Sequence, residues 1–322
     1  MIRSFLFPVL LSGAAFAQVG GPILGYVPDG STIRPMYGLP AAGAIGAEIA
    51  EGGWVKIAIS PSQNFVVATH ADNGEVLLVN LVQPSVTSIS GASASPDILA
   101  ISPSGTSAAL WFQSSGHLQT ITGLPNAPVL RDIDASFLHA SASGIAVSDD
   151  GQWTVALFST GLYAFGPTAQ VIPLQTDPGI LAVAFFHTNH TLALATAARA
   201  TSITDVGGAN QPSVLYDYSQ QSLSPRALAV SFDNSQAVIA DSTGKVVNIN
   251  VAASTANIVD CGCSPAGVFP LGGSVFRLTG VPGPARNALE RSGSRPDLKV
   301  FDASAGAVWI VPPALSAKGG RQ

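Results

Sequence analysis

One short phrase recurs along the chain, and its clearest copy reads Leu99-Ala100-Ile101-Ser102-Pro103-Ser104. It consists of an aliphatic residue, an alanine, a second aliphatic residue, usually a serine, and then a turn. The other copies begin at Ile57, Ile145, Leu181, Leu228 and, in a degenerate form, Gly267. The steps between the first five copies are 42, 46, 36 and 47 residues. The chain is therefore an array of similar units with a mean period of about 43 residues.

Each unit has room for four short strands separated by turns. In the second unit, residues 108–112 and 117–122 are strand-like, and Ser114-Ser115-Gly116 supplies the turn between them. A period of about 40 to 45 residues with four strands per unit is typical of β-propellers. We therefore predict an all-β protein, a β-propeller with six four-stranded repeats and an N-terminal hairpin at 23–27 and 32–37. The hairpin either forms a seventh blade or extends another one, and we favour seven blades because open sheet edges promote aggregation.

The recurring alanine has a steric explanation in this fold. The innermost strands of a propeller converge on the axis, where a side chain that faces the neighbouring blade has little room. Alanine fits there, and the aliphatic residues on either side point to the opposite face of the sheet because strand side chains alternate. We predict that each phrase forms the innermost strand of its blade.

The five phrases and their spacing resemble the exported bacterial β-propellers loosely called YVTN-type or WD-repeat-like. The resemblance covers residues 23–314 as architecture. The chain lacks the Trp-Asp dipeptide and the Gly-His pair of the WD-repeat pattern, so no functional residue is carried over from that family. The resemblance implies that such a propeller acts as a binding platform, with lactonases and other enzymes as known exceptions.

The first 17 residues have the three parts of a secretory signal peptide. Arg3 is positively charged, residues 5–14 are apolar, and Ala15-Phe16-Ala17 is a small-x-small cleavage pattern before Gln18. The apolar run is too short to span a bilayer. We expect a signal peptide at 1–17, a single propeller domain at 18–315 and a disordered tail at 316–322. The mature chain should be exported to the periplasm or the extracellular space, without a transmembrane anchor.

The charge of the chain is low and unevenly distributed. Charged residues make up 10% of the 322 residues, and the formal net charge is −5. Residues 18–276 carry 16 acidic and 6 basic residues, whereas residues 277–322 carry 7 basic and 3 acidic ones. An acidic body with few basic stripes argues against nucleic-acid binding. The basic segment 280–297 could dock an acidic partner or be a solvated insertion.

The two cysteines, Cys261 and Cys263, are separated by Gly262. A disulfide across one residue requires the chain to turn, and glycine permits this turn. In an oxidising compartment a bridge is favoured over two free thiols. A metal or redox role lacks the usual spacing of a paired-cysteine motif and a nearby histidine.

No linear motif for nucleotide, zinc-protease, serine-hydrolase or calcium chemistry occurs in the chain. A propeller can still assemble a site from single residues on several blades, because the connections that lead into the innermost strands meet at one mouth of the channel. Five polar residues lie two to seven positions before a phrase: Asp97, His139, Asp177, Arg226 and Asp260. They could bind a cation or perform acid–base chemistry, or they could be ordinary polar loop residues. We assign no metal ligands and expect no cofactor, with a divalent cation as the alternative.

Two histidines, His187 and His190, flank the dipeptide Thr188-Asn189 between two strands of one unit. Metal binding there would need a third and a fourth ligand, and the sequence identifies neither. We therefore interpret this segment as a hydrophilic turn.

Two functional hypotheses follow from these observations. The first is an exported propeller that acts as a non-enzymatic binding or scaffold module for a protein, peptide or glycan partner. The alternative is a lactonase-like or other hydrolase with its site at the mouth of the central channel, metal-dependent or not. The sequence does not decide whether the protein is an enzyme.

Overall fold

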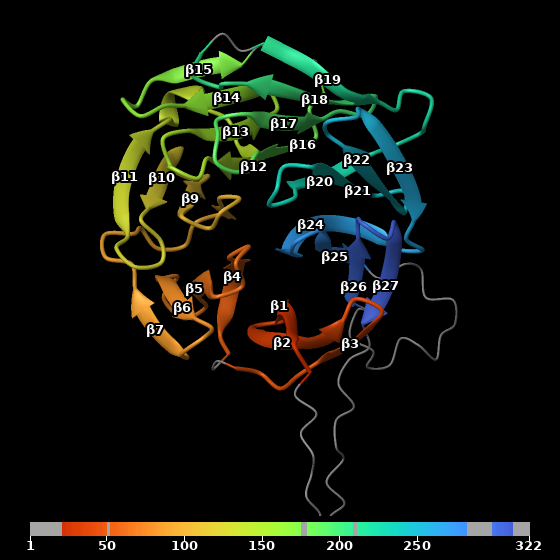
Figure 1. Cartoon of the computed structure of the whole chain (residues 1–322). Coiled ribbons are helices and arrows are strands. Elements are labelled where there is room, and N and C mark those ends of the chain that lie inside the picture. Colours follow the sequence, from red (N-terminus) through yellow and green to blue (C-terminus); the bar gives the residue numbers. More distant parts are fainter. Residues whose placement is uncertain (1–20, 50–51, 175–178, 209–210, 282–297, 312–322) are drawn as a thin grey trace, which may run out of the picture.

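The computed structural model describes residues 21–49, 52–174, 179–208, 211–281 and 298–311. These residues form seven antiparallel sheets arranged in a ring (Figure 1). Within the described ranges, the helical content is a single 3-10 turn at Ser136–Leu138. The predicted all-β propeller is confirmed, with seven blades. The expected signal peptide, Asp177, most of the basic segment 280–297 and the expected tail lie outside the described residues.

Six blades have four strands and the first has three. In chain order, blade 1 contains β1 (Ile23–Asp29), β2 (Thr32–Leu39) and β3 (Ala42–Ile45); blade 2 contains β4 (Trp54–Ile59), β5 (Phe65–His70), β6 (Val76–Asn80) and β7 (Ser85–Ser88); blade 3 contains β8 (Ile98–Ile101), β9 (Ser107–Phe112), β10 (His117–Thr122) and β11 (Val129–Asp134); blade 4 contains β12 (Ala142–Val147), β13 (Thr154–Phe158), β14 (Gly161–Phe165) and β15 (Val171–Leu174); blade 5 contains β16 (Ala182–Phe185), β17 (Leu192–Ala195), β18 (Arg199–Thr204) and β19 (Gln211–Asp217); blade 6 contains β20 (Pro225–Val230), β21 (Gln236–Asp241), β22 (Lys245–Asn250) and β23 (Thr255–Asp260); blade 7 contains β24 (Ser264–Gly272), β25 (Val275–Val281), β26 (Leu298–Asp302) and β27 (Ala307–Val311).

The repeated phrases form the innermost strands, as predicted. Strands β4, β8, β12, β16, β20 and β24 each begin a four-stranded meander, and each of the first five lies beside the corresponding strand of the next blade (Figure 1). The phrase alanine faces the next blade. Ala229 packs in the cluster between blades 6 and 7, whereas Leu228 and Val230 pack in the cluster between blades 5 and 6.

Replacing Ala229 by leucine should lower the free energy of unfolding by about 1 to 3 kcal/mol, because overpacking a closed site forces neighbours to shift. Ala229 is 6% exposed and lies against blade 7, so the longer side chain has no free space. Denaturant unfolding measures the effect. The matched control is Val86→Leu on outermost strand β7, where the side chain is 50% exposed and the change should be neutral. Equal stability of both variants and the wild type would contradict this placement.

The copy in blade 5 has a different register from the one that the sequence predicts. The backbone N–H of Phe186 bonds to Thr191 O, as that of Ser231 bonds to Gln236 O in blade 6. Phe186 is therefore equivalent to the phrase serine, and the phrase reads Val183-Ala184-Phe185 rather than Leu181-Ala182-Val183. Because strand side chains alternate with a period of two, a shift of two residues leaves each side chain on the same face of the sheet. The apolar pattern of the sequence is therefore the same in both registers.

The serine of the phrase closes the turn that follows it. Ser60, Ser102, Ser148 and Ser231 are buried, and the hydroxyl oxygen of each accepts the backbone N–H of the residue five positions later. In blade 5 the side-chain oxygen of Asn189 accepts the N–H of Thr191 instead. The serine thus satisfies a backbone donor at the first residue of the second strand or immediately before it.

Blade 1 contains the predicted hairpin and a third strand, but its strands hold the second, third and fourth positions of a blade. In blade 2, Ser95 in the connection to the next blade donates its N–H to Gly74 O in the turn between the second and third strands. Gly53 makes the same bond to Ser31 O in the turn between β1 and β2, at 3.1 Å. No described strand therefore occupies the innermost position of blade 1.

The side chain of Gln63 bonds to the exposed edge of β1. Its Oε1 accepts the N–H of Tyr26 at 2.7 Å, and its Nε2 donates to Ser60 O and to Pro270 O, at 3.1 and 3.2 Å. The next donor position along this edge is Pro28, which has no N–H. One amide side chain therefore joins blades 1, 2 and 7 and blunts the edge against further strand pairing.

Buried hydrophobic clusters fill the junctions between neighbouring blades, one at each of the seven junctions that the described residues form. The cluster between blades 7 and 1 is the smallest, with Val27, Met36, Leu271, Val300 and Val311 as its buried members. The ring thus closes by side-chain packing between the first and last blades, at its least extensive junction.

Candidate functional site

The meander topology gives the propeller two different ends. At one, here called the connection end, lie the segments that lead from each outermost strand to the next innermost strand. At the other, here called the turn end, lie the turns that follow each phrase. Asp97, His139, Arg226 and Asp260 all lie at the connection end, in or beside these segments. The structure therefore brings four predicted residues to one end of the ring, and Asp177 is not described.

Each of these side chains is exposed, and the two carboxylates bond to nearby backbone. Asp97 Oδ2 accepts the N–H of Gln113 at 2.6 Å, and Asp260 Oδ1 accepts the N–H of Gly262 at 2.8 Å. His139 follows the 3-10 turn with a left-handed backbone, φ +46°. Among the described residues, no three His, Cys, Asp or Glu side chains are grouped so that they could hold a metal ion.

Bulges near the start of the innermost strands turn extra residues toward the connection end. They interrupt the register between Trp54 and Ile57 in β4, Ala142 and Gly144 in β12, Pro225 and Ala227 in β20, and Pro265 and Gly267 in β24. The residues inside the bulges are all exposed: Val55, Lys56, Ser143, Arg226 and Ala266. Bulges re-aim side chains in this way at many binding and active sites. Arg226 was predicted from its position in the sequence and the others were not, because bulges are defined by strand pairing.

Large apolar side chains accompany these polar ones. Phe137, in the 3-10 turn, is 55% exposed, Val55 is 59% exposed and Leu181 is 42% exposed. The connection end therefore combines an exposed aromatic ring and aliphatic groups with charges of both signs.

The connection between blades 6 and 7 contains a disulfide between Cys261 and Cys263, whose Cα atoms are 5.2 Å apart. Gly262 has the left-handed backbone, φ +53°, that this tight loop requires. Lys299 Nζ donates to Cys261 O and Gly262 O at 2.8 and 2.9 Å. The bridge and the lysine together fix the course of this connection.

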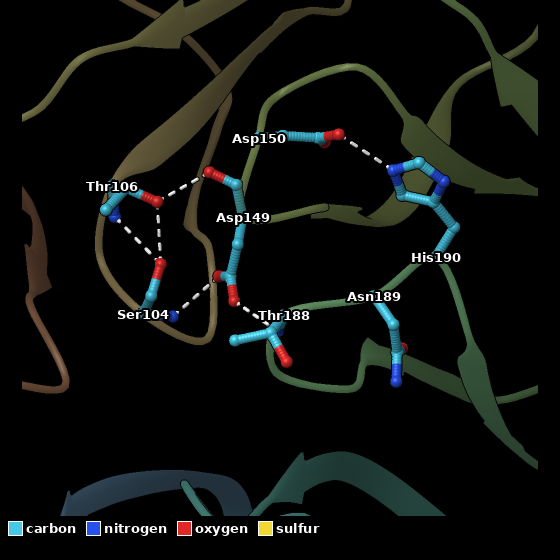
Figure 2. Close-up of a pocket in the computed structure, with 7 residues that line it drawn as sticks. All are labelled: Ser104, Thr106, Asp149, Asp150, Thr188, Asn189 and His190. Carbon is cyan, nitrogen blue, oxygen red and sulfur yellow. Dashed lines mark hydrogen bonds and ion pairs between the residues drawn. The ribbon is translucent and has the colours of Figure 1, made fainter.

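A depression of about 410 Å³ lies at the turn end, between the turns of blades 3, 4 and 5 (Figure 2). Its lining residues are Ser104, Thr106, Asp149, Asp150, Thr188, Asn189 and His190. Asp149 organises it: Oδ1 accepts the N–H of Ser104 at 2.6 Å, and Oδ2 accepts the N–H of Thr188 at 2.7 Å. One carboxylate thus joins three consecutive blades.

Asp150 contacts the neighbouring blade through His190, with 2.8 Å between Oδ2 and Nε2. Burial alone would raise the pKa of Asp150, but hydrogen bonds from Ser148, Gln152 and His190 outweigh it and hold the pKa below its ordinary value. On the same turn as His190, the ring of His187 lies against exposed Phe232, with centroids 4.1 Å apart. The hydrophilic turn predicted at 187–190 is thus also one wall of a depression. The residues that this turn contacts, Asp149 and Asp150, lie about 40 positions earlier in the chain. An alignment of the turns of successive repeats would have paired them.

Comparisons with known proteins bear on the fold. No protein-family model matches the chain, and no curated protein sequence does. Among solved structures, virginiamycin B lyase from Staphylococcus aureus superposes with a TM-score of 0.58 at 11% identity, covering 82% of this chain and 85% of that chain. The Cps50 (Swd1) β-propeller domain from Myceliophteria thermophila superposes with a TM-score of 0.53 at 9% identity, covering 81% and 94%. At such identities the likeness shows the propeller fold alone.

Proposed function

We propose that this chain is an exported, non-enzymatic binding module that presents the connection end of its propeller to a partner. Of the protein, peptide and glycan partners that the sequence allows, a protein or peptide fits this end best. We also propose that the chain is one of the exported YVTN-type propellers that its repeats resemble. The disulfide supports export, since such bridges persist in oxidising compartments. Among the described residues, no helix has the length and apolar character needed to cross a membrane.

The observation that carries the proposal is the set of bulges in four innermost strands. A bulge interrupts the strand ladder, and here each one places at least one exposed side chain at the connection end. Aromatic and arginine side chains are enriched in protein interfaces, and a polar, solvent-accessible rim surrounds them. Phe137, Arg226 and Lys56 supply these groups on separate blades, which suits an extended surface rather than a small enclosed site.

The alternative, a hydrolase, is favoured by the His190–Asp150 contact in the depression at the turn end. Covalent hydrolysis needs a side-chain nucleophile bonded to the base. The nearby hydroxyl of Ser104 instead bonds Thr106 Oγ1 at 2.6 Å, and His190 and Asp150 are 33% and 48% exposed. This exposure to solvent fits a hydrated polar surface better than a catalytic site that excludes water.

A peptide selection tests the proposal. The full-length protein is immobilised and a random peptide display library is selected on it. Peptides that bind should lose about tenfold or more in affinity toward the variants Phe137→Ser and Arg226→Ala, as is usual for truncated interface anchors. Affinities are measured with the isolated synthetic peptides.

The matched control is Phe232→Ser, which removes an equally exposed phenylalanine, 59% against 55%, from the turn end. It should leave peptide affinity unchanged. Dependence of the selected peptides on Phe232 instead of Phe137 would overturn the assignment to the connection end. Failure to select any binder, together with ester hydrolysis that Asp150→Asn abolishes, would favour the hydrolase.

A further inference from the structure

One cross-strand pair facing the next blade is small and apolar in five blades and different in the last. The phrase alanine lies opposite a valine or alanine of the second strand in blades 2 to 6. The pairs are Ala58 with Val67, Ala100 with Ala109, Ala146 with Val155, Ala184 with Ala193, and Ala229 with Val238. At the equivalent place in blade 7, Phe269 lies opposite Arg277. Both small residues are thus replaced together, and one replacement is a charge.

The pair faces blade 1, where no described strand holds the innermost position. Phe276 and Leu278 pack in the cluster between blades 6 and 7, so Arg277 between them faces the other way. Val275, on the same face as Arg277, packs against the cluster of Val27 and Met36. Both side chains thus lie on the face of blade 7 that packs against blade 1.

Arg277 is a buried charge without a matching anion in the described part of the chain. Its side chain is 5% exposed, and the guanidinium carbon lies 4.6 Å from the ring centroid of Phe269. Its backbone pairs with Phe269 and Val300, but no hydrogen bond or ion pair joins its guanidinium to another described residue. Burial lowers its pKa to about 10, so the group remains protonated at neutral pH. Buried charges in proteins are ordinarily paired, because desolvation without a partner is costly.

The guanidinium retains access to a ligand. Arg277 is 5% exposed, so the described residues do not enclose it completely. Phe269 is 45% exposed on innermost strand β24. A fixed aromatic ring with a cation beside it therefore lies midway along the innermost strand.

We propose that Arg277 and Phe269 form a binding site for a small carboxylate ligand with a planar apolar part. The planar fork of arginine matches a carboxylate in two parallel hydrogen bonds. A single negative charge compensates the single buried cation, and the apolar part of the ligand lies against the ring of Phe269. This site is independent of the connection end and of any peptide bound there.

Benzoate is a suitable probe, with benzamide as its uncharged control. Saturation-transfer NMR and thermal melting of the full-length protein should detect benzoate, and not benzamide, at concentrations up to about 10 mM. Arg277→Met should weaken benzoate binding by about 10- to 100-fold, the usual effect of losing hydrogen bonds to a charged group. Phe269→Ala should weaken it by about 3- to 10-fold. Benzoate should raise the melting temperature of the wild type and leave that of Arg277→Met unchanged.

The same variants distinguish a ligand site from a structural arginine. Without ligand, Arg277→Met should melt at or above the wild-type temperature, because an apolar residue replaces an uncompensated charge. A decrease of about 5 °C or more would show that the chain itself already compensates the charge, and would overturn the proposal. Equal benzoate binding by the wild type and Arg277→Met, or no binding by the wild type, would also overturn it. None of these results depends on the peptide selection.

Discussion

Gln63→Ala should lower the free energy of unfolding by about 2 to 4 kcal/mol, because it leaves two partly buried backbone groups unpaired at the closure of the ring. The groups are the N–H of Tyr26 in blade 1 and the carbonyl of Pro270 in blade 7. The hydrophobic cluster at this junction is small, so little other packing compensates for the loss. Denaturant unfolding measures the change, and hydrogen exchange locates it. The amides of β1 and β2 should exchange faster in the variant.

Asn234→Ala is the matched control for this prediction. Asn234 has the same left-handed backbone, φ +60° against +58°, and also bonds a neighbouring blade through its side chain. At its junction both blades have innermost strands, so we expect a smaller loss, about 1 to 2 kcal/mol, without faster exchange in blade 1. If Gln63→Ala leaves exchange in residues 23–39 unchanged, Gln63 does not close the ring.

Asp149→Ala should have an effect of similar size, about 2 to 4 kcal/mol. The carboxylate is 12% exposed and accepts backbone N–H groups from the turns of blades 3 and 5. Hydrogen bonds to a charged group are stronger than neutral ones, and truncation leaves both donors without this acceptor. Asp149→Asn retains one carbonyl oxygen and should lose about half as much. Thermal and denaturant unfolding at neutral pH measure both variants.

The neighbouring carboxylate provides the control. Asp150 is about half exposed and bonds chiefly within its own turn, so Asp150→Ala should cost less than about 1 kcal/mol at neutral pH. Because its pKa in the folded protein is lowered, this small contribution is present above the ordinary carboxyl value of 3.8 and lost as the pH falls below it. Equal losses for Asp149→Ala and Asp150→Ala would contradict the role of Asp149 as a link between blades.

The candidate site divides into residues that sequence position could find and residues that it could not. Asp97, His139, Arg226 and Asp260 were predicted because each precedes a phrase, and every such position lies at the connection end of a propeller. No sequence feature singles out Val55 and Ser143 as residues of the site. They are exposed there because a bulge displaces them, and a bulge depends on which residues of two strands are paired. Asp149 and His190 belong to different repeats, so only the turn of one blade against the next brings them together.

The local pattern of the chain was sufficient for the class of fold, the placement of the phrases on the innermost strands and, in blades 2 to 6, the face that each phrase residue takes. These features follow from the two-residue period of strands and from a repeat of about 43 residues, both of which can be read one segment at a time. In blade 7 the predicted start at Gly267 is one residue too early, because Val268 packs toward blade 6 and Phe269 holds the alanine position. The positions that the three described strands of blade 1 take in the blade, the bonding of Gln63 to three blades and the pairing of Phe269 with Arg277 required the tertiary structure. Each depends on the junction between the first and last blades, where residues more than 200 positions apart meet. The contacts at this junction form only when the ring closes, so a local pattern in the sequence does not predict them.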